Sequence, residues 1–446
     1  MKTALTQISV LPSVFRVGEE KEITLSPLDP KFAFEEDADY RVILAPRNGY
    51  TPRFDESPCV TAAKGRDGKL VFSHRFEKED AYALRVFKGE KCLWSGEVFA
   101  LEDDLFALRP LKGDTHVHSC RSDGLDSPSV VAANYRAAGF DFMALTDHRR
   151  YEPSVEMIGA YRDIPLGMTL INGEEVHSPD AVLHIVHFGG MSSVNEIFEK
   201  DKDRFFREVD EIDRTEKIPF SDEKMRFAYA SALWCVREIH RADGIAVFPH
   251  PCWIYEGFQN MFNVPNDLSR AFLLNDVFDA FEIVAGQSSR ENNFQAMLFY
   301  ELREEYLEKT GRRIPVALLG ASDSHGTVNR GLFDRKFSIV FAPSRQTEDI
   351  KNAIRRGMTA AVEIPEADYS RFHAQEEPYP YSVHGSLRLA SYAAFLMENY
   401  FPLTRQIAFP EGEMMRRASG GENEAKEDLQ RVSSRTDDFY RRFFGR

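Results

Sequence analysis

The sequence predicts an α/β protein in which an N-terminal all-β domain is followed by a β/α sheet or barrel and a helical C-terminal extension. Short strand-like runs separated by turn signals fill residues 1–110. Apolar strand-like runs then alternate with helical patterns over residues 111–365, and residues 366–446 are mostly helical in pattern. Such alternation is typical of a parallel sheet or barrel. At 446 residues the chain can form more than one core, since single cores stop growing at about 250–300 residues.

The N-terminal domain is predicted from five runs rich in β-branched and aromatic residues: Lys21–Leu25, Tyr40–Leu44, Lys69–Phe76, Ala81–Phe87 and Cys92–Phe99. Turn signals separate the runs at Asn48-Gly49, Asp67-Gly68 and Lys88-Gly89. Regular short strands with such turns indicate a small immunoglobulin-like β-sandwich. We expect the aromatic side chains of this domain to form its core.

After Pro110 six strand-like runs alternate with helices: Phe140–Thr146, Met168–Asn172, Val182–Phe188, Gly244–Phe248, Ala280–Val284 and Val316–Leu319. The helices include Pro128–Ala138, with proline in its favoured place in the first turn, and Phe294–Lys309. The stretch from about 195 to 227 is highly charged and interrupts the alternation. It predicts a helical insertion, which is either a solvated helix or a substrate lid.

Net charge and apolar content exclude several classes of partner. The formal net charge is −15 and basic clusters are short, whereas proteins that neutralise nucleic-acid phosphates normally carry a basic face or tail. Nucleic acid is therefore disfavoured, and we expect a small-molecule substrate, anionic in character. No apolar stretch approaches the roughly 20 residues of a membrane span, so we expect no membrane association. The sequence leaves open whether the chain forms a homo-oligomer.

The N-terminus and the cysteines indicate a reducing compartment. The first residues lack the uninterrupted apolar core of a secretory signal. Five cysteines are scattered, odd in number and without a C-x-x-C pair, which fits reduced thiols. We therefore expect a cytoplasmic protein. Cys120 and Cys252 lie beside chemical motifs, but no base stands at a fixed spacing, so packed thiols are expected rather than nucleophiles.

The chemistry of the chain is concentrated in the segment Gly113–Gly124, which contains His116 and His118. Two histidines two residues apart on a strand point to the same face and can chelate a divalent ion. A lone H-x-H pair is weak support, because a structural role is equally compatible with it. Further His, Asp and Glu residues at strand ends strengthen the metal hypothesis: Asp147-His148, Glu174-Glu175, His184, His250 and Asp323–His325.

The clustering of these residues favours a metal centre over a structural role. Nine of the twelve histidines lie between His116 and His325, and at least four strands carry His, Asp or Glu at their carboxyl ends. In a β/α barrel this is the face on which active sites are built. Crowded polar groups left unpaired would be costly, so shared cations are the simplest explanation.

The order of motifs, H-x-H…S-D-G, T-D-H, G-x-E…H, H-P and S-D-x-H, resembles the PHP (polymerase and histidinol phosphatase) superfamily of metal-dependent hydrolases. Within it, the chain is similar to the branch that contains carbaryl-type ester and carbamate hydrolases. The matching segments are Gly113–Ser119, Ser122–Gly124, Ala144–His148 and Gly320–Gly326. The resemblance covers about residues 111–365 and is specific for fold and metal binding rather than for substrate.

The resemblance implies a distorted (β/α)7 PHP-type barrel that binds two or three divalent ions. A first ion would be held by His116, His118, Glu175 and Asp323. Glu175 would bridge to a second ion, which His184 and His250 complete. Asp123, His148 and His325 would hold a third ion; family members often have histidine near the position of Asp123.

Neighbouring residues leave some assignments open. Glu174 is the alternative to Glu175, His187 is the alternative to His184, and His177 is a further candidate to line the pocket. Asp114 and Asp147 are better placed to orient imidazoles than to bind metal directly. Glu282 either faces the site or is solvated.

Mixed nitrogen and oxygen ligands suit Zn²⁺, Mn²⁺ or Fe²⁺, and two ions about 3.5–4 Å apart can activate a hydroxide nucleophile. Asp323 and His325 are candidates to relay the proton. Four arginines follow motif ends and are candidates to bind a phosphate or carboxylate, with Arg330 first among Arg149, Arg150, Arg290 and Arg330.

The leading functional hypothesis is a metal-dependent hydrolase, a phosphoesterase on a small molecule. The close alternative is hydrolysis of a carboxylic ester, carbamate or amide, which the nearest branch suggests. Two further classes are a nuclease-like activity and a noncatalytic metal-binding scaffold. The acidic charge disfavours the former and the near-complete ligand set disfavours the latter.

Overall fold

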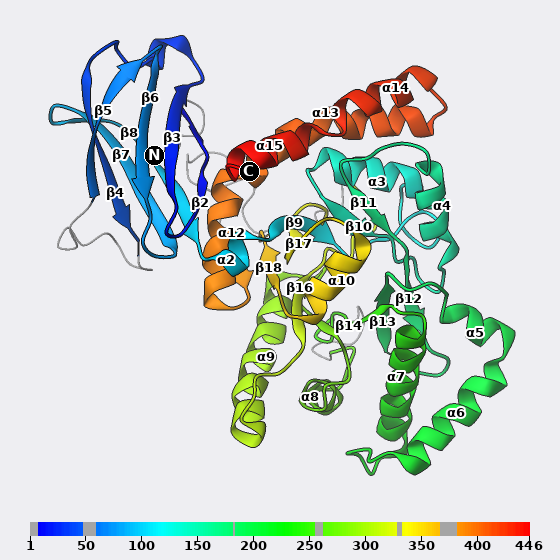
Figure 1. Cartoon of the computed structure of the whole chain (residues 1–446). Helices are drawn as coiled ribbons and strands as arrows, with labels where there is room; N and C mark the ends of the chain where they lie inside the picture. Colours follow the sequence, from blue (N-terminus) through cyan, green and yellow to red (C-terminus); the bar gives the residue numbers. More distant parts are fainter. Residues whose placement is uncertain (1–7, 48–58, 182, 255–261, 328–331, 366–380) are drawn as a thin grey trace.

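The computed structural model describes residues 8–47, 59–181, 183–254, 262–327, 332–365 and 381–446 as a mixed α/β protein with several sheets and a helical C-terminal region (Figure 1). The strands of the N-terminal domain are β1 (Ile8–Leu11), β2 (Val14–Arg16), β3 (Glu20–Pro27), β4 (Asp39–Pro46), β5 (Cys59–Arg66), β6 (Lys69–Arg75), β7 (Asp80–Lys88) and β8 (Lys91–Leu101). A single helical turn, η1 (Pro30–Phe32), interrupts them. They form one eight-stranded sheet in the order β1-β3-β6-β5-β4-β7-β8-β2.

Strand β5 joins the two halves of this sheet, because its residues 59–64 pair with β4 and its last residues, Gly65 and Arg66, pair with β6. Inward residues of both halves, such as Leu25 from β3 and Val86 from β7, belong to one apolar cluster. The hairpin β5–β6 turns at Asp67-Gly68, and both residues have positive φ (49° and 70°), as a tight two-residue turn requires. This turn was predicted from sequence; the predicted turn Asn48-Gly49 lies outside the described residues.

Two further sheets make up the central region. The first contains β9 (Arg109–Asp114), β10 (Phe142–Ala144), β11 (Thr169–Ile171), β17 (Lys336–Ala342), β18 (Thr359–Glu363) and β19 (Ser382–His384), in the order β11-β10-β9-β17-β18-β19. The second contains β12 (Gly173–His177), β13 (His184–Phe188), β14 (Ile245–Phe248), β15 (Ala280–Val284) and β16 (Ala317–Gly320), in that order.

The expected distorted (β/α)7 barrel is not clearly seen in the described ranges. Neighbours β12–β13–β14 and β9–β17–β18 pair antiparallel, whereas β9–β10–β11 and β14–β15–β16 pair parallel. The sheets are linked where Asn172 alone separates β11 from β12, and by isolated bridges Val117↔Ser324 and His148↔Glu175. Apolar side chains from both sheets, including Leu111, Val186 and Leu319, form a common core between them. The strands of the two sheets therefore share a core, but they form two separate hydrogen-bonded sheets in place of the distorted barrel that the resemblance implied.

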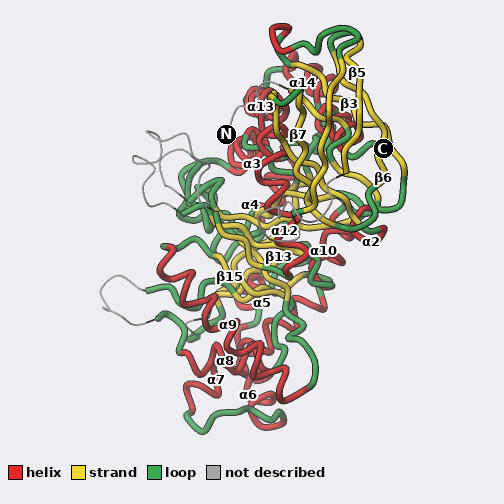
Figure 2. The backbone as a smooth tube through the Cα atoms, turned by 90° about the vertical axis from the view of Figure 1, so that its left-hand side faces the viewer, coloured by secondary structure: helices red, strands yellow, loops and turns green. Residues whose placement is uncertain are grey.

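Helices cover the outside of these sheets. They are α2 (Asp103–Phe106), α3 (Pro128–Ala137), α4 (Glu152–Ala160), α5 (Asn195–Lys200), α6 (Lys202–Thr215), α7 (Glu223–Arg241), α8 (Asn266–Leu274), α9 (Ser289–Thr310) and α10 (Thr347–Arg355). The charged stretch from 195 to 227 forms α5, α6 and the start of α7, which agrees with a helical insertion. The apolar face of α6, including Phe205 and Val209, packs on Trp234 of α7 and neighbouring side chains. Figure 2 shows α6, α7 and α8 at the end of the molecule opposite the N-terminal strands.

The C-terminal region consists of α12 (Leu387–Asn399), α13 (Phe401–Ser419), α14 (Asn423–Val432) and α15 (Arg435–Phe443). It is not wholly helical, since β19 adds a strand to the central sheet beside β18. Helix α13 lies against α3 at Gly412, where a Cβ atom would come within 2.6 Å of the Ala133 carbonyl oxygen. Glycine is therefore required for this close helix contact.

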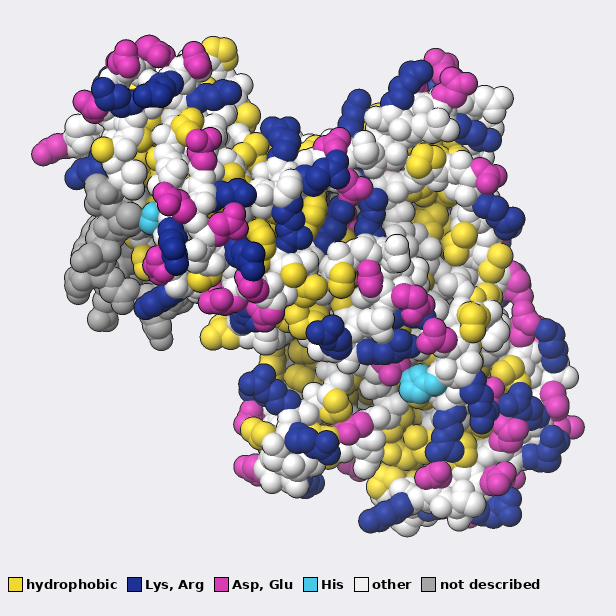
Figure 3. Space-filling view, in the orientation of Figure 1, with side chains coloured by type: hydrophobic (Ala, Val, Ile, Leu, Met, Phe, Trp, Pro, Cys, Tyr) yellow, Lys and Arg dark blue, Asp and Glu magenta, His cyan; other side chains and the backbone are white. Residues whose placement is uncertain are grey.

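The surface mixes charges of both signs. On the face shown in Figure 3, Lys and Arg side chains are interspersed with Asp and Glu side chains over both the N-terminal and central regions. Across the described parts of the chain, none of the helices has the length and apolar character needed to cross a membrane.

Candidate metal centre

The strands place the predicted ligands at one edge of the central sheets. His116 and His118 follow β9, His148 follows β10, and His250 follows β14. Because β13 is antiparallel to β14, its first residue His184 lies at the same edge as the carboxyl ends of its neighbours. Residues that are far apart in sequence therefore meet in one cluster of imidazoles and carboxylates.

The first group joins His116 and His118 to two carboxylates. The Nε2 atoms of His116 and His118 lie 3.3 and 3.0 Å from Oδ1 of Asp323. The same nitrogens lie 3.6 and 3.7 Å from the two oxygens of Glu175. Both histidines and Glu175 are completely or almost completely buried. These spacings suit donors that surround one ion at about 2.0–2.2 Å.

The second group is built around the other side of Glu175. Oε1 of Glu175 lies 2.8 Å from Nδ1 of His184 and 3.4 Å from Nε2 of His250. His116 of the first group also faces Oε1, whereas Oε2 faces His118, His148 and His177, so each oxygen of Glu175 contacts several imidazoles, as a carboxylate that bridges two ions would.

The third group lies beside the first. Asp123 Oδ1 is 3.2 Å from Nε2 of His325 and 3.6 Å from Nε2 of His148. The ring of His118 stacks between them, with centroids 4.2 Å from His148 and 4.3 Å from His325. Asp123 is the exposed member, with 59% of its side chain accessible. The structure therefore brings together all nine predicted ligands: His116, His118, Asp123, His148, Glu175, His184, His250, Asp323 and His325.

Hydrogen bonds orient two of the imidazoles so that Nε2 is left to face the cluster. Nδ1 of His116 lies 2.9 Å from Oε1 of the buried Glu282 and donates to it. Nδ1 of His325 donates to the Asp323 carbonyl oxygen at 2.8 Å. A histidine whose Nδ1 proton is engaged in this way keeps a lone pair on Nε2 for a metal.

Two buried aspartates hold the ligand loops from behind. Asp114 accepts hydrogen bonds from the backbone of His116 and Ser322 and from the Tyr135 hydroxyl, at 2.9–3.2 Å. Asp147 accepts from the backbone and hydroxyl groups of Ser119 and Ser122 at 2.6–3.0 Å. Both aspartates thus bond to the loops that carry the predicted ligands, through backbone and hydroxyl groups rather than through the imidazole rings that the sequence led us to expect.

The alternation of β12 separates the two adjacent glutamates. Glu174 points away from the cluster, and accepts from Nδ1 of His187 at 3.1 Å and from the hydroxyl of Ser193 at 2.6 Å. Glu175 points into the cluster. For both pairs of neighbouring candidate ligands, the two members lie on opposite faces of the sheet. Glu175 and His184 lie in the cluster, and Glu174 and His187 pair with each other behind it.

Several buried polar atoms in the cluster lie within ion-pair distance of one another but form no hydrogen bond of good geometry among the described residues. They are Nε2 of His116 and His118, Oε2 of Glu175, Nδ1 of His184 and Oδ1 of Asp323. Buried polar atoms are normally satisfied, because burying them without a partner costs free energy. Cations at these positions would satisfy them, so the donor set fits divalent ions with mixed nitrogen and oxygen ligands.

Electrostatics make the cluster attractive to cations. Burial raises the pKa of Asp323, but the charges of His116 and His118 outweigh it and hold that pKa well below its usual range. The hydrogen bond to His325 lowers the pKa of Asp123 to about 2. Burial lowers the pKa of His325, yet its contacts with Asp123 and Asp323 prevail and raise it to about 9. The carboxylates are therefore ionised at neutral pH.

The backbone is strained at two of the ligands. His250 and Asp323 have φ values of 27° and 49°, in the region that side chains other than glycine rarely adopt. Gly286 packs so closely on Asp323 that a Cβ atom would lie 2.2 Å from the Asp323 Cβ. Such strain persists where the surroundings hold it, and it is common at functional sites.

Other candidates from the sequence fall outside this cluster or at its rim. Arg330 lies outside the described residues, and Arg149, Arg150 and Arg290 are exposed. Cys120 is exposed, whereas burial raises the pKa of the Cys252 thiol to about 12, which argues against a thiolate nucleophile there. Two residues that sequence reasoning left unassigned join the site: Glu282 behind His116, and His177 beside Glu175.

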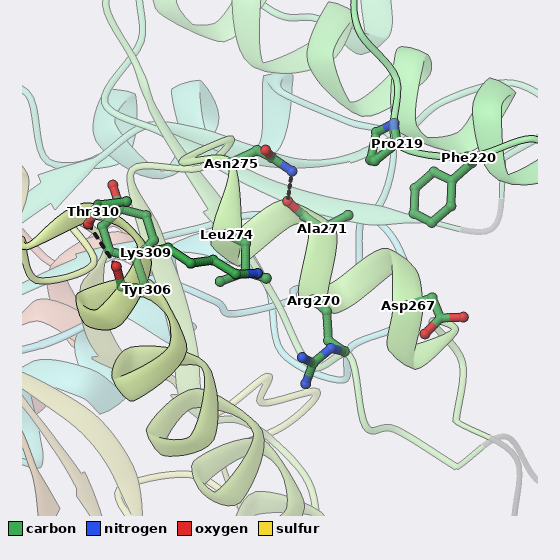
Figure 4. Close-up of a pocket in the computed structure, with 10 residues that line it drawn as sticks. All are labelled: Pro219, Phe220, Asp267, Arg270, Ala271, Leu274, Asn275, Tyr306, Lys309 and Thr310. Carbon is green, nitrogen blue, oxygen red and sulfur yellow. Dashed lines mark hydrogen bonds between the residues drawn. The ribbon is translucent and has the colours of Figure 1, made fainter.

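A separate pocket of about 380 Å³ lies between α8, α9 and the loop that contains Pro219 and Phe220 (Figure 4). Its polar side chains already have partners: Arg270 bonds to Glu301 and Glu305, and Asn275 bonds to the Ala271 carbonyl oxygen. Among the described residues, none of the groups of His, Asp and Glu that could share a metal ion lines it. The metal cluster is therefore the better candidate for chemistry.

No family model and no curated protein matches the chain. Solved structures match in part. A two-domain protein from Bacteroides vulgatus that contains a predicted PHP-like metal-dependent phosphoesterase is 19% identical, with a TM-score of 0.37, over 57% of this chain and 65% of that one, just under two thirds of its length. A candidate metal-dependent phosphoesterase from Bifidobacterium adolescentis is 16% identical, with a TM-score of 0.34, over 49% and 90% of the two chains.

An amidohydrolase from Chromobacterium violaceum, with bound sulfate and no metal, is 18% identical, with a TM-score of 0.30, over 48% of this chain and 87% of that one. At these identities and TM-scores the matches say nothing about substrate. The resemblance to the PHP superfamily therefore rests on the motifs of the sequence and not on these matches.

Proposed function

We propose that this protein is a metal-dependent hydrolase, and that its leading activity is phosphoester hydrolysis on a small molecule. The observation that carries the proposal is the position of the buried Glu175: its Oε1 faces His116, His184 and His250, and its Oε2 faces His118, His148 and His177. A carboxylate shared by two ligand sets is the arrangement needed for a pair of adjacent ions. We further propose that the two central sheets correspond to the distorted PHP-type barrel, since two isolated bridges link them beside the cluster.

Divalent ions bound here would act as Lewis acids, lower the pKa of water and neutralise charge on a departing oxygen. The protein residues position these ions and the substrate. Glu282 and Asp114 fix the ring and the loop of His116, which keeps Nε2 directed at the first group. Buried walls around His116, His118 and Glu175 exclude water and strengthen electrostatic interactions with the substrate.

The third ligand group favours a phosphoester over a neutral substrate. A phosphoester carries negative charge on its non-bridging oxygens, and charge stabilisation is the main requirement for its hydrolysis. Asp123, His148 and His325 would add a third cation next to the first group. The exposed side chains of Arg149 and Arg150 follow His148 at the same edge and could contact an anion.

The test is a hydrolase screen on protein reconstituted separately with zinc, manganese and iron. We expect turnover of aryl phosphates, and a loss of at least about a hundredfold in kcat/KM in the Glu175→Gln variant. Glu301→Gln, a surface carboxylate paired with Arg270, is the matched control and should retain activity. Rapid turnover of aryl esters, carbamates or amides with resistance of every phosphoester would instead establish the alternative hydrolase class.

Two other outcomes would remove the proposal. Release of nucleotides from single-stranded oligomers, with no turnover of small phosphoesters, would indicate a nuclease-like activity. Failure of the metal-loaded protein to hydrolyse anything in a broad panel would favour a noncatalytic metal-binding scaffold.

A further inference from the structure

His177 belongs to the metal-facing side of β12, although none of the three ligand groups described above includes it. Successive side chains of a strand alternate between faces, so Glu175 and His177 share a face and Glu174 lies on the other. The register places His177 directly opposite His184 of β13. Their rings stack with centroids 4.0 Å apart and an interplanar angle of 22°. His177 is therefore a neighbour of an expected ligand on the adjacent strand.

Nε2 of His177 faces a carboxylate oxygen of Glu175 that another imidazole also contacts. Nε2 of His177 lies 3.5 Å from Oε2 of Glu175 and 3.0 Å from Nδ1 of His148. That oxygen is buried, and Nδ1 of His148 also contacts it, so two imidazoles meet at this carboxylate oxygen. One donor atom from each of His148, Glu175 and His177 lies within 4.8 Å of the others. Two imidazole nitrogens and one carboxylate oxygen at this spacing match the donor types of a zinc site.

The helical insertion holds His177 in this position. The side chain of Asn195, the first residue of α5, is almost fully buried. Its Oδ1 accepts a hydrogen bond from the His177 backbone nitrogen at 3.2 Å. Its Nδ2 donates to the Glu175 carbonyl oxygen at 3.1 Å and to Oε2 of Glu174 at 2.9 Å. A single amide therefore fixes the backbone on both sides of the Glu175–His177 segment.

We propose that His177 is a further metal ligand, which binds a divalent transition-metal ion together with Glu175, and that Asn195 is the positioning residue that holds it there. The inference rests on the proposed metal centre and adds a tenth donor to it. It also gives the insertion a role as an anchor of the ligand strand. The ion would be of the zinc, manganese or iron class, since imidazole and carboxylate are the donors.

The first test measures metal binding without any substrate. Zinc and manganese affinities of the full-length His177→Gln variant are determined by competition with a chromogenic chelator. We expect at least one ion to bind at least about tenfold more weakly, because loss of groups that merely support ligands already costs 10–100-fold. His240→Gln is the matched control. His240 lies on α7, outside the cluster, and pairs with Asp279, so its replacement should leave both affinities unchanged. An unchanged affinity in His177→Gln overturns the proposal.

A structure of the zinc-loaded protein provides the direct test. Nε2 of His177 should lie about 2.0–2.1 Å from an ion. A nitrogen that hydrogen-bonds to His148 or to substrate, with no ion in contact, overturns the proposal even if the variant has reduced activity.

The positioning role of Asn195 is tested in parallel. Asn195→Ala should lower the affinity for the same ion as His177→Gln does, by roughly tenfold. Circular dichroism of the metal-free proteins checks that the variant folds. Asn266→Ala is the matched control, since Asn266 is likewise the first residue of a helix, α8, but is exposed. Equal affinities for Asn195→Ala and wild type overturn this role.

These outcomes separate the inference from the proposed function. If wild-type protein binds ions more tightly than His177→Gln but hydrolyses nothing, the inference stands and the hydrolase proposal fails. If wild-type protein hydrolyses phosphoesters and His177→Gln binds metal equally well, the hydrolase stands and the inference fails.

Discussion

Nδ1 of His116 donates a hydrogen bond to Oε1 of Glu282 across 2.9 Å, and both side chains have no solvent exposure. The contact links β15, which carries Glu282, to the loop that follows β9. It fixes the tautomer of His116, so that the lone pair on Nε2 faces Asp323 and Glu175. Carboxylate partners of this kind also make the imidazole a stronger ligand.

Replacement of this carboxylate is expected to weaken metal binding without removing a ligand. In Glu282→Gln the amide oxygen can still accept from Nδ1, but the negative charge is lost. We expect a roughly tenfold loss of affinity for the ion on His116, and Glu282→Leu to lose more because no acceptor remains. Chelator competition measures both, and equal affinities for wild type and Glu282→Leu would refute this role for Glu282.

The residues that gather in the cluster could be selected from sequence because most of them stand in short motifs at the ends of apolar strands. His116, His148 and Asp323 could be selected without knowing which strands pair. Glu282 could not be assigned, since a carboxylate inside a strand faces the site or the solvent according to the packing of that strand. Glu174 and Glu175 were likewise separable only by the register of β12 against β13.

Strand direction explains the difference between the predicted and observed sheets. An apolar run such as Val182–Phe188 has the same pattern whether the strand is parallel or antiparallel to its neighbour. Here β13 and β17 run antiparallel to the strands beside them, so the sheets depart from a regular parallel barrel. The segment Lys336–Ala342, completely buried in β17, was not identified as a strand from sequence.

A buried ion pair attaches the C-terminal helices to the central region. Nε of Arg136 in α3 donates to Oε2 of Glu411 in α13 at 2.8 Å, and neither residue is more than 1% exposed. We expect Glu411→Ala to lower the free energy of unfolding by about 3–5 kcal/mol, because a buried guanidinium would lose its counter-ion. Urea denaturation measures the change.

The double variant Arg136→Met/Glu411→Leu is the control for this pair. Replacing both charges with apolar groups of similar volume should recover most of the lost stability. If the double variant were less stable than Glu411→Ala, loss of the counter-ion would not be the cause.

An exposed ion-pair network joins α12 to the N-terminal part of the chain. The Arg388 guanidinium bonds to Glu79 at 2.7 Å and to Asp104 at 2.5 and 2.6 Å. The bond from Arg388 lowers the pKa of Asp104 from 3.8 to about 2. A carboxyl group whose pKa is depressed by folding stabilises the native state above its unfolded pKa and loses this effect as pH falls toward the folded pKa.

Arg388→Ala should therefore be less stable than wild type at neutral pH, by about 1 kcal/mol at low salt. The difference in thermal midpoint between the two proteins should shrink as pH falls from 3.8 toward 2, and also as salt rises. A difference that is constant with pH and salt would mean that Arg388 acts through packing.

Replacement of the exposed carboxylate Asp123 is expected to affect binding of the third ion only. It contacts His325 and His148 but none of the residues of the second group, Glu175, His184 and His250. Asp123→Asn removes an anionic ligand, so the variant should bind one ion fewer per chain while it retains the pair on Glu175. Asp123→His supplies another nitrogen donor and should retain the full stoichiometry. Elemental analysis after dialysis measures the number of ions.

Because the third cation would neutralise phosphate charge, Asp123→Asn should also lose phosphoester turnover more than affinity for the remaining ions. Loss of every ion in Asp123→Asn would show instead that the three groups bind metal as one unit.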